Sequence, residues 1–306
     1  MESEVIADTT AHEKNITYPT DLKLHLKVID WVWRTAKSEN IIFRQSYKRT
    51  VPKLKWEARY VRIPRRAKQG NKAVRKLKTI AGRLLRDIMR KMSQEQLELH
   101  CKNLEICQKI LDQKRKDKNK IYSFHEPEVA CIAKGKEHRK YEFGSKASIL
   151  LTKNTNIIVG ALNFKGNPYD GKTLDYALNQ YSQLFDRSPK KVLVDEGYRG
   201  KEKIGLTEIL RVHKERKRGY SRRSWRSRFR RRAAVEPVIG HLKHDHRLGR
   251  NFLKGVIGDE INLMMACAAF NFKKLLRSFD FIWLKIKKAL WLVIAPYNYN
   301  LRTLVS

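Results

Sequence analysis

The sequence predicts an α/β protein in which a mixed β-sheet is flanked by helices. Short apolar runs rich in β-branched residues, at 3–10, 143–164 and 191–195, predict strands. The long segments between them repeat apolar residues every three or four positions, which predicts helices. The resulting order of strand, long helical insertion, hairpin, helix, strand and helix is typical of a mixed sheet with helices packed on it, and not of a bundle or sandwich.

Composition indicates a globular protein with a polyanionic partner. The 306 residues are 42% apolar, enough for a buried core and one or two domains. Lys and Arg number 67 against 31 Asp and Glu, a formal net charge of +36. Such an excess opposes a compact chain by self-repulsion unless a polyanion neutralises it. Nucleic acid is therefore the favoured partner, and a merely soluble basic protein is the alternative.

Neither the cysteines nor the termini suggest secretion or a membrane. The four cysteines lack Cys-x-x-Cys spacing, so we expect buried small side chains in a reducing compartment and neither a zinc site nor disulfides. Residues 1–8 do not resemble a signal peptide. The apolar stretch Phe281–Ala295 is interrupted by lysines and is shorter than the ~20 residues that span a bilayer. It predicts a C-terminal amphipathic helix and tail over 279–306, and no membrane partner.

The first strand and a basic helical insertion account for the first 121 residues. Residues 1–20 are predicted to hold the first strand, with Asp8 at or just beyond its end. Thr20 or Asp21 can cap a helix in which Leu22, Leu26, Ile29 and Trp33 follow at helical intervals. The helical pattern continues through 21–121. Its Lys and Arg faces suit either a solvated surface or a clamp on DNA, and the pattern alone slightly favours the solvated surface.

Residues 122–278 are predicted to complete the core. The segment 122–140 has no periodicity and predicts an irregular basic loop. Residues 143–152 and 156–164 are predicted to form two strands joined by a hairpin turn at 153–155. A turn at 167–171 and a helix ending before Pro189 follow, and then a strand from Lys191 that stops on Asp195. A further apolar helix at 262–276 closes the core.

The stretch 229–250 places one acid, Glu236, in the most basic part of the chain. At 3.6 residues per turn one helical stripe, the Glu236 stripe, contains Phe229, Arg232, Glu236 and Lys243. The apolar residues at 235, 239 and 242 lie on a neighbouring face, so Glu236 belongs at the rim of the buried face. Pro237 removes a backbone hydrogen bond, which predicts that the helix bends or begins near Glu236.

Two strand-ending aspartates and the helical Glu236 form a candidate metal site. Mg²⁺ and Mn²⁺ prefer hard oxygen ligands, and phosphoryl transfer with two metal ions needs two or three converging carboxylates. Neighbouring strands lie about 4.8 Å apart, so Asp8 and Asp195 could share an ion if their strands are adjacent. Taken alone, a strand-ending Asp is more often a turn residue, and Glu236 a salt-bridge partner. Together, in so basic a chain, they favour a metal site.

Histidines offer a competing site. A second ligand set could be drawn from His213, His241, His244 and His246, several of which come near one helix face. No second cluster of metal ligands in the sequence supports this interpretation. Contact with phosphate beside Arg247 explains these histidines equally well.

Three blocks of the sequence resemble a known family. They are Asp8–Asp21, the run Asp195-Glu-Gly-Tyr198, and the Glu236 stripe. Together they resemble the bacterial insertion-sequence transposases of the DDE type, in the insertion sequence five group, over nearly the whole chain. The third block is the most specific, because the family pattern is Tyr, two residues, Arg, three residues, Glu, six residues, Lys. The approach from Lys134-Gly-Lys136 to Phe143-Gly-Ser-Lys146 is also similar.

The resemblance implies an RNase H-like fold and a DNA-cleaving active site. Asp8, Asp195 and Glu236 would be the catalytic residues and the ligands of two Mg²⁺ (or Mn²⁺) ions. The implied DNA-binding residues are Arg232, Lys243, Phe229, Arg247 and Arg250. The reaction would be metal-dependent cleavage at the element ends, followed by attack of the freed 3′-hydroxyl on target DNA. The implied partner is double-stranded DNA, and the resemblance is compatible with a homo-oligomer. The implied location is the bacterial cytoplasm, at the nucleoid.

Two departures from the family pattern add further expectations. Family members usually carry a helical domain before the first catalytic Asp, whereas Asp8 is almost the first residue here. The resemblance therefore predicts an incomplete copy without the amino-terminal DNA-binding domain, and a catalytically inactive DNA-binding remnant is the alternative. A stand-alone nuclease of the same fold is a third interpretation. Phe229 replaces the family Tyr and lacks its hydroxyl, which we expect to weaken positioning without abolishing metal binding.

Overall fold

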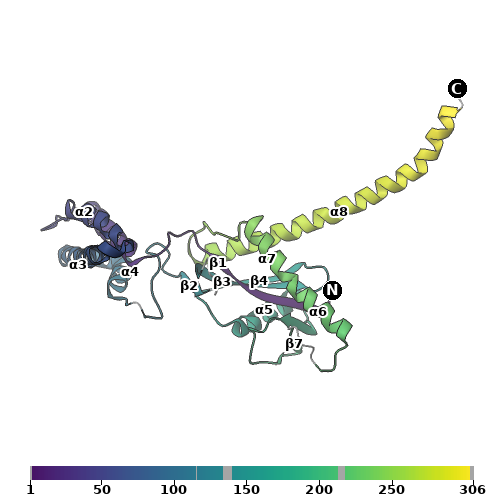
Figure 1. The fold of residues 1–306 in the computed structure, drawn as a ribbon, viewed down its shortest axis with the longest axis horizontal. Helices are drawn as coiled ribbons and strands as arrows, with labels where there is room; N and C mark the ends of the chain where they lie inside the picture. Colours follow the sequence, from purple (N-terminus) through teal and green to yellow (C-terminus); the bar gives the residue numbers. More distant parts are fainter. Residues whose placement is uncertain (1, 115, 134–139, 213–217, 304–306) are drawn as a thin grey trace.

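The computed structural model describes residues 2–114, 116–133, 140–212 and 218–303, with side chains up to residue 290 (Figure 1). Its strands are β1 (Glu4–Glu13), β2 (Ala130–Ala133), β3 (Tyr141–Thr152), β4 (Ile158–Phe164), β5 (Lys191–Val194), β6 (Lys203–Ile204) and β7 (Thr207–Arg211). Its α-helices are α1 (Asp21–Ser38), α2 (Thr50–Glu57), α3 (Ala67–Lys91), α4 (Gln94–Asp112), α5 (Asp170–Phe185), α6 (Arg222–Ala233), α7 (Val235–His244) and α8 (Gly255–Thr303). Two short 3₁₀ turns, η1 (Ala58–Arg62) and η2 (Pro64–Arg66), lie between α2 and α3.

The strands form one mixed sheet in the order β2-β3-β1-β5-β7-β6, with β4 paired to β3. β1 runs antiparallel to β3 and parallel to β5, and β5 runs parallel to β7. Helices lie on both sides of this sheet. The α/β class is therefore confirmed, and the mixed sheet with helices on both sides is consistent with the RNase H-like fold that the resemblance implies.

Alternation along β1 decides which side chains face which helices. Val5 and Ala7 belong to the buried cluster that α5 covers. Ile6 belongs to the cluster covered by α6, α7 and the start of α8. Because side chains of a strand alternate between the two faces of a sheet, Asp8 shares the face of Ile6 and points toward α6 and α7.

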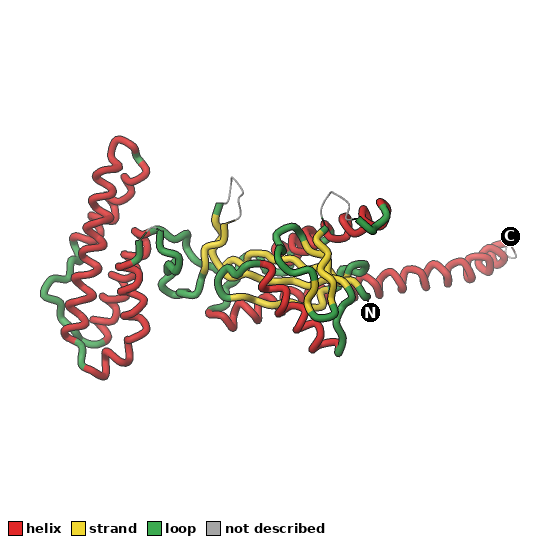
Figure 2. The backbone as a smooth tube through the Cα atoms, turned by 90° about the horizontal axis from the view of Figure 1, so that it is seen from below, coloured by secondary structure: helices red, strands yellow, loops and turns green. Residues whose placement is uncertain are grey.

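The insertion has a core of its own. The helices α1 to α4 enclose a separate set of buried side chains that includes Val28, Ile29, Leu77 and Leu85. Figure 2 shows these helices gathered to one side of the strands. The predicted cap at Thr20 is confirmed, since its side chain accepts a hydrogen bond from the backbone of Lys23. The separate core supports an insertion over 21–121, although its predicted boundaries stay a prediction.

Several predicted elements differ from the structure. β1 continues to Glu13, so Asp8 lies within the strand and not at its end. The reason is that β3 pairs with β1 as far as Glu13, whereas the ladder with β5 ends at Ile6. The sequence analysis also missed β2, in the segment expected to be irregular, and β6 and β7 after Asp195. These strands have only four, two and five residues, too few to show a clear period of two. The loop residues Lys134 and Lys136 lie outside the described residues.

Two smaller expectations were wrong. Cys101 is exposed and Cys131 is half-buried, whereas Cys107 and Cys267 are buried as expected. Cys101 lies on α4, whose buried face is formed by other residues. The helix predicted at 262–276 and the one predicted within 279–306 are parts of one helix, α8. The segment between them contains neither Gly nor Pro to end the first.

Within the described residues, no helix has both the length and the apolar character required to cross a membrane.

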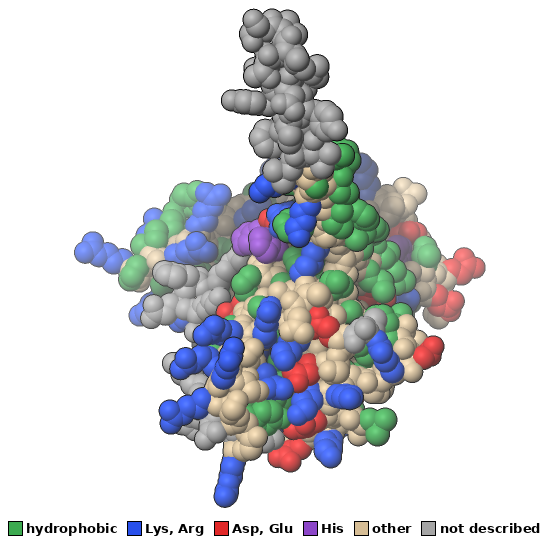
Figure 3. Space-filling view, turned by 90° about the vertical axis from the view of Figure 1, so that its right-hand side faces the viewer, with side chains coloured by type: hydrophobic (Ala, Val, Ile, Leu, Met, Phe, Trp, Pro, Cys, Tyr) green, Lys and Arg blue, Asp and Glu red, His purple; other side chains and the backbone are tan. Residues whose placement is uncertain are grey.

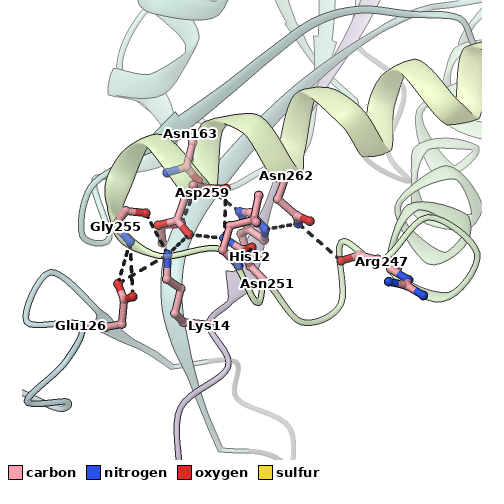
Figure 4. A network of polar contacts seen from close by, with 12 residues as sticks. His12, Lys14, Glu126, Asn163, Arg247, Asn251, Gly255, Asp259 and Asn262 are labelled. Carbon is pink, nitrogen blue, oxygen red and sulfur yellow. Dashed lines mark hydrogen bonds and ion pairs between the residues drawn. The ribbon is translucent and has the colours of Figure 1, made fainter.

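A buried polar network ties the end of β1 to the start of α8 (Figure 4). Lys14 Nζ donates to Asp259 Oδ1 at 2.5 Å and to the carbonyl oxygen of Gly255 at 2.9 Å. Asn251 Nδ2 donates to the same Asp259 oxygen at 2.6 Å, and Glu126 Oε2 lies 3.6 Å from Lys14 Nζ. The Lys14 side chain is only 3% exposed. This network fixes the loop before α8 against the strand that carries Asp8.

Replacing Lys14 with Met should lower the free energy of unfolding by about 3–5 kcal/mol, because it leaves the Asp259 carboxylate buried without its cation. Urea denaturation measures the change. Lys201→Met is the control, since it breaks a pair with Asp175 whose lysine is 60% exposed and should cost less than about 1 kcal/mol. Equal losses in the two variants would contradict the role given to the network.

Candidate active site

Backbone register brings the two aspartates together. The parallel ladder pairs Val5 with Val192 and Ile6 with Leu193. Extended by two residues, the same register sets Asp8 opposite Asp195. Leu193 belongs to the cluster beneath α6 and α7, so Asp195, two residues on, emerges on that same face. The sequence analysis required the strands of Asp8 and Asp195 to be neighbours, and β1 and β5 are neighbours in the sheet.

Glu236 lies where the helix is interrupted, one turn after Arg232. α6 ends at Ala233 and α7 begins at Val235, which makes Glu236 the second residue of α7 and Pro237 the third. Proline is tolerated in a first turn, where its missing N–H has no partner to lose. The predicted break near Glu236 is confirmed. Val235 and Leu242 are fully buried and anchor α7 to the sheet, while the Glu236 side chain is 69% exposed.

One guanidinium group contacts all three carboxylates. Arg232 Nη2 lies 3.2 Å from Asp195 Oδ2 and 3.7 Å from Asp8 Oδ2, and Arg232 Nη1 lies 3.4 Å from Glu236 Oε1. The Arg232 side chain is 17% exposed. A residue of α6 thus links acids from β1, from the end of β5 and from α7. The three acids named by the sequence analysis lie around a single cationic group.

The two aspartates are oriented by backbone donors. The N–H of Thr9 donates to Asp8 Oδ1 at 2.8 Å, and the N–H of Gly197 donates to Asp195 Oδ1 at 2.9 Å. A side chain at 197 would press on Asp195, because a Cβ built there falls 3.0 Å from Asp195 Oδ1. Glycine at this position therefore lets the loop turn close beneath the carboxylate.

Asp8 is held in an environment that disfavours its charge. Burial raises the pKa of the Asp8 carboxyl to about 6, and the negative charges of Asp195 and Asp170 add to the rise. Arg232 and the N–H of Thr9 oppose this shift without cancelling it. Carboxyl groups whose pKa is strongly shifted by burial and by neighbouring charges are typical of functional sites. They are not typical of ion pairs that stabilise a fold.

A fourth acid, Asp170, was missed by the sequence analysis. It begins α5 on the other face of the sheet, where its Oδ1 accepts hydrogen bonds from Thr9 Oγ1 at 2.7 Å and Lys146 Nζ at 2.9 Å. Burial raises the pKa of the Tyr198 hydroxyl well above its usual value, and Asp8, Asp170 and Asp195 raise it further. In the sequence, the run Asn-Pro-Tyr-Asp-Gly predicted only a turn. The feature that could have drawn attention to Asp170 was its position at the start of the helix that follows this turn.

The part of the chain that contains Asp195 and Glu236 matches a known protein family. Residues 109–272, more than half of the chain, match the transposase DDE domain family. The chain belongs to this family. Asp195 and Glu236 lie inside the matched segment and Asp8 lies before it. No curated protein and no solved structure shows significant similarity to the chain.

Members of this transposase family generally use divalent metal ions, and the acids of this chain are chemically suited to hold them. Carboxylate oxygens are the ligands that Mg²⁺ prefers. Burial raises the pKa of Asp8 and so disfavours its charged form, and a bound cation would offset that penalty, which is a second point of fit. As they stand, no three potential metal ligands among the described residues are grouped closely enough to hold an ion. The Arg232 guanidinium occupies the space between them.

The basic residues predicted to contact DNA have different surroundings in this transposase domain. Arg247 and Arg250 are exposed in the segment after α7, and Lys243 is half-buried. Burial lowers the pKa of His12, and the positive charges of Lys14 and Lys243 lower it further. Phe229 packs against the core under α6, so its ring has a structural contact that the sequence could not reveal.

The histidine alternative gains no support from the structure. His241 Nδ1 lies 3.0 Å from Asp245 Oδ2, and that carboxylate also accepts from Lys273. His244 is exposed, and His246 packs edge-on against Phe270. The described histidines belong to no group of three metal-binding side chains. His213 lies outside the described residues.

Replacing Asp8 with Asn should stabilise the metal-free transposase at pH 8 and leave it nearly unchanged at pH 4. The carboxyl has a raised folded-state pKa of about 6, so its favourable contribution is complete below the unfolded value near 4 and is lost as pH rises through 6. The expected gain at pH 8 is roughly 2 to 3 kcal/mol. Thermal denaturation in chelator at both pH values measures it.

The matched control is Asp175→Asn, because Asp175 pairs with Lys201 at the surface and should show no such gain at pH 8. An Asp8→Asn variant that is less stable than the parent at pH 8 would show that Asp8 is a structural partner of Arg232 and not a strained functional acid.

Proposed function

We propose that this transposase catalyses metal-dependent DNA strand cleavage and strand transfer at Asp8, Asp195 and Glu236. The observation that carries the proposal is the Arg232 contact with these three acids, which come from three separate elements. A surface salt bridge needs one acid and one base. Three carboxylates around one cation leave negative charge in excess, which suits a site that takes further cations.

The three acids would hold Mg²⁺ or Mn²⁺, as two ions. Bound there, the metal would supply Lewis-acid activation of a water or 3′-hydroxyl and stabilisation of the leaving oxygen. Asp8 and Asp195 are set by the sheet and by backbone donors, so they form the rigid part of the site. Glu236 is exposed at the start of α7 and can adjust to the substrate.

Arg232 would change partners when cations and DNA arrive. Its planar fork matches a phosphate as well as a carboxylate, and it is already placed beside the acids. With the carboxylates neutralised by metal, the guanidinium is free to bind the phosphate next to the scissile bond. Lys243, Arg247 and Arg250 would continue this contact along α7 and the segment after it. Figure 3 shows Lys and Arg side chains spread over the visible face of the protein.

We further propose that the helical insertion over 21–121 is a second unit that grips DNA. A hollow of about 700 Å³ between the segment 44–47 and α3 is lined by four arginines. They are Arg44, Arg83, Arg86 and Arg90. Asp87 is the one acid among the described residues that line this hollow, so the local charge remains strongly positive. Such a cluster suits phosphate groups better than a merely solvated face.

Asp8→Asn, Asp195→Asn and Glu236→Gln should each abolish Mg²⁺-dependent nicking of duplex DNA that carries the element ends, with a loss of at least about 100-fold. Each substitution removes one carboxylate and keeps the side-chain volume. DNA affinity should stay within a few fold, because phosphate contacts supply most of it. Gel assays of nicking and of strand joining measure the activity.

Glu202→Gln is the control, since that acid is 80% exposed and lies after Asp195 without contact to the three acids. Wild-type protein that binds DNA with steep salt dependence but never nicks it would identify an inactive DNA-binding remnant. Nicking without joining of a 3′-end would identify a nuclease. Equal residual activity in the three variants would refute the site assignment.

Replacing Arg83 and Arg86 together with Ala should reduce the salt dependence of DNA binding without affecting stability by more than about 1 kcal/mol, because surface charges contribute little to folding. The slope of log affinity against log salt should fall by about 0.9 for each phosphate that the variant no longer neutralises. Fluorescence anisotropy over a salt series measures it. Arg187→Ala, outside the insertion, is the control, and an unchanged slope in the double variant would rule out the grip.

A further inference from the structure

The outer side of α8 carries a regular apolar seam. Its members follow one another at alternating intervals of four and three residues, the spacing of a coiled-coil heptad. The seam consists of Ile261, Met265, Ala268, Phe272, Leu275, Phe279, Ile282, Ile286 and Ala289. A repeat kept over four heptads exceeds what a helix needs to rest on a globular core, and indicates a helical partner.

This seam faces away from the rest of the protein. The buried apolar side chains of α8 are on the opposite side, at Leu263, Ala266 and Cys267, where they join the core beneath α7. Phe281 continues that inner side and lines the hollow between α7 and α8. The seam positions are exposed, with Met265 at 67% and Phe279 at 60%. Figure 3 shows hydrophobic side chains along one side of the projecting helix.

The residues flanking the seam determine which partner is acceptable. Charges at these flanks normally select between like and unlike helices. Here the flanks hold Asn262, Met264, Ala269, Asn271, Leu276, Ser278, Trp283, Lys285 and Leu290. Lys285 is the one charged residue among them. Up to residue 290, the other lysines and arginines of α8, at 273, 274, 277, 287 and 288, lie on the inner side and away from the seam.

We propose that α8 pairs with the α8 of a second copy of this chain, as a coiled coil along this seam. The nearly uncharged flanks remove the repulsion that would otherwise separate two copies of so basic a protein. An acidic partner helix would be expected to meet basic flanks, which the seam lacks. The pairing is independent of the proposed chemistry, because none of its residues belongs to the site around Arg232.

The exposed area is sufficient for a stable dimer. Phe272, Phe279 and Trp283 are each about 60% exposed, and an aromatic side chain can bury roughly 150–250 Å². Met265, Leu275, Leu276, Ile282 and Ile286 add aliphatic area of similar exposure. Contributed by both copies, these side chains exceed the ~1,000 Å² that marks a specific interface.

Phe279 and Phe281 provide a matched test. They are the same residue type, 60% and 59% exposed, two positions apart on opposite sides of α8. Sedimentation equilibrium of the nucleic-acid-free protein at high salt should show a dimer at micromolar concentration for the parent and for Phe281→Lys. Phe279→Lys should raise the dimer dissociation constant by at least about 100-fold, because it places two lysines in the seam.

A second seam variant tests whether the effect of Phe279→Lys comes from a local folding defect. Ile282→Lys should also give a monomer, whereas Leu284→Lys, off the seam and 62% exposed against 52% for Ile282, should stay dimeric. Circular dichroism should show the same helix content in all four variants. A monomeric parent protein, or equal weakening by the seam and off-seam substitutions, would overturn the proposal. Binding to anionic vesicles without self-association would do the same and would make lipid the occupant of α8.

Discussion

The parallel pairing of β1 with β5 is the constraint on which the candidate site depends. Backbone hydrogen bonds between these strands fix the register that places Asp8 level with Asp195. The alternation of side chains then sends both acids to the face covered by α6 and α7. A shift of one residue in either strand would turn its aspartate toward α5 and separate the pair. The hydrophobic side chains of β1 and β5, all buried, prevent such a shift.

Arg232 is the counterpart of this arrangement on the helical side. It restrains three carboxylates that would otherwise repel one another, yet the pKa of Asp8 stays raised to about 6. The folded chain therefore carries unfavourable charge at the place where the proposed chemistry occurs. Such a cost is expected where a site is arranged for cations and a phosphate and not for stability alone. Asp170 and Tyr198 extend the same charged environment through the sheet to the α5 face.

The helical insertion and α8 are both connected to the sheet near the end of β1. The Lys14 and Asp259 network joins the end of β1 to the start of α8, so the strand that carries Asp8 also fixes the helix that carries the apolar seam. The insertion after β1 builds its own core and leaves the sheet undisturbed. The arginine-rich hollow of the insertion and the apolar seam of α8 are therefore separate surfaces outside the site around Arg232.

The sequence by itself determined the α/β class, the cap at Thr20, the strands around Asp8 and Asp195, and the break beside Pro237. Each of these follows from local spacing or from the backbone chemistry of one residue. Only the tertiary structure decided that Asp8 lies within its strand, that Asp170 approaches from the opposite face, and that Phe229 packs into the core. It also merged two predicted helices into α8. The physical reason is that strand partners, buried charges and the faces of helices depend on residues far apart in the chain, which no local pattern records.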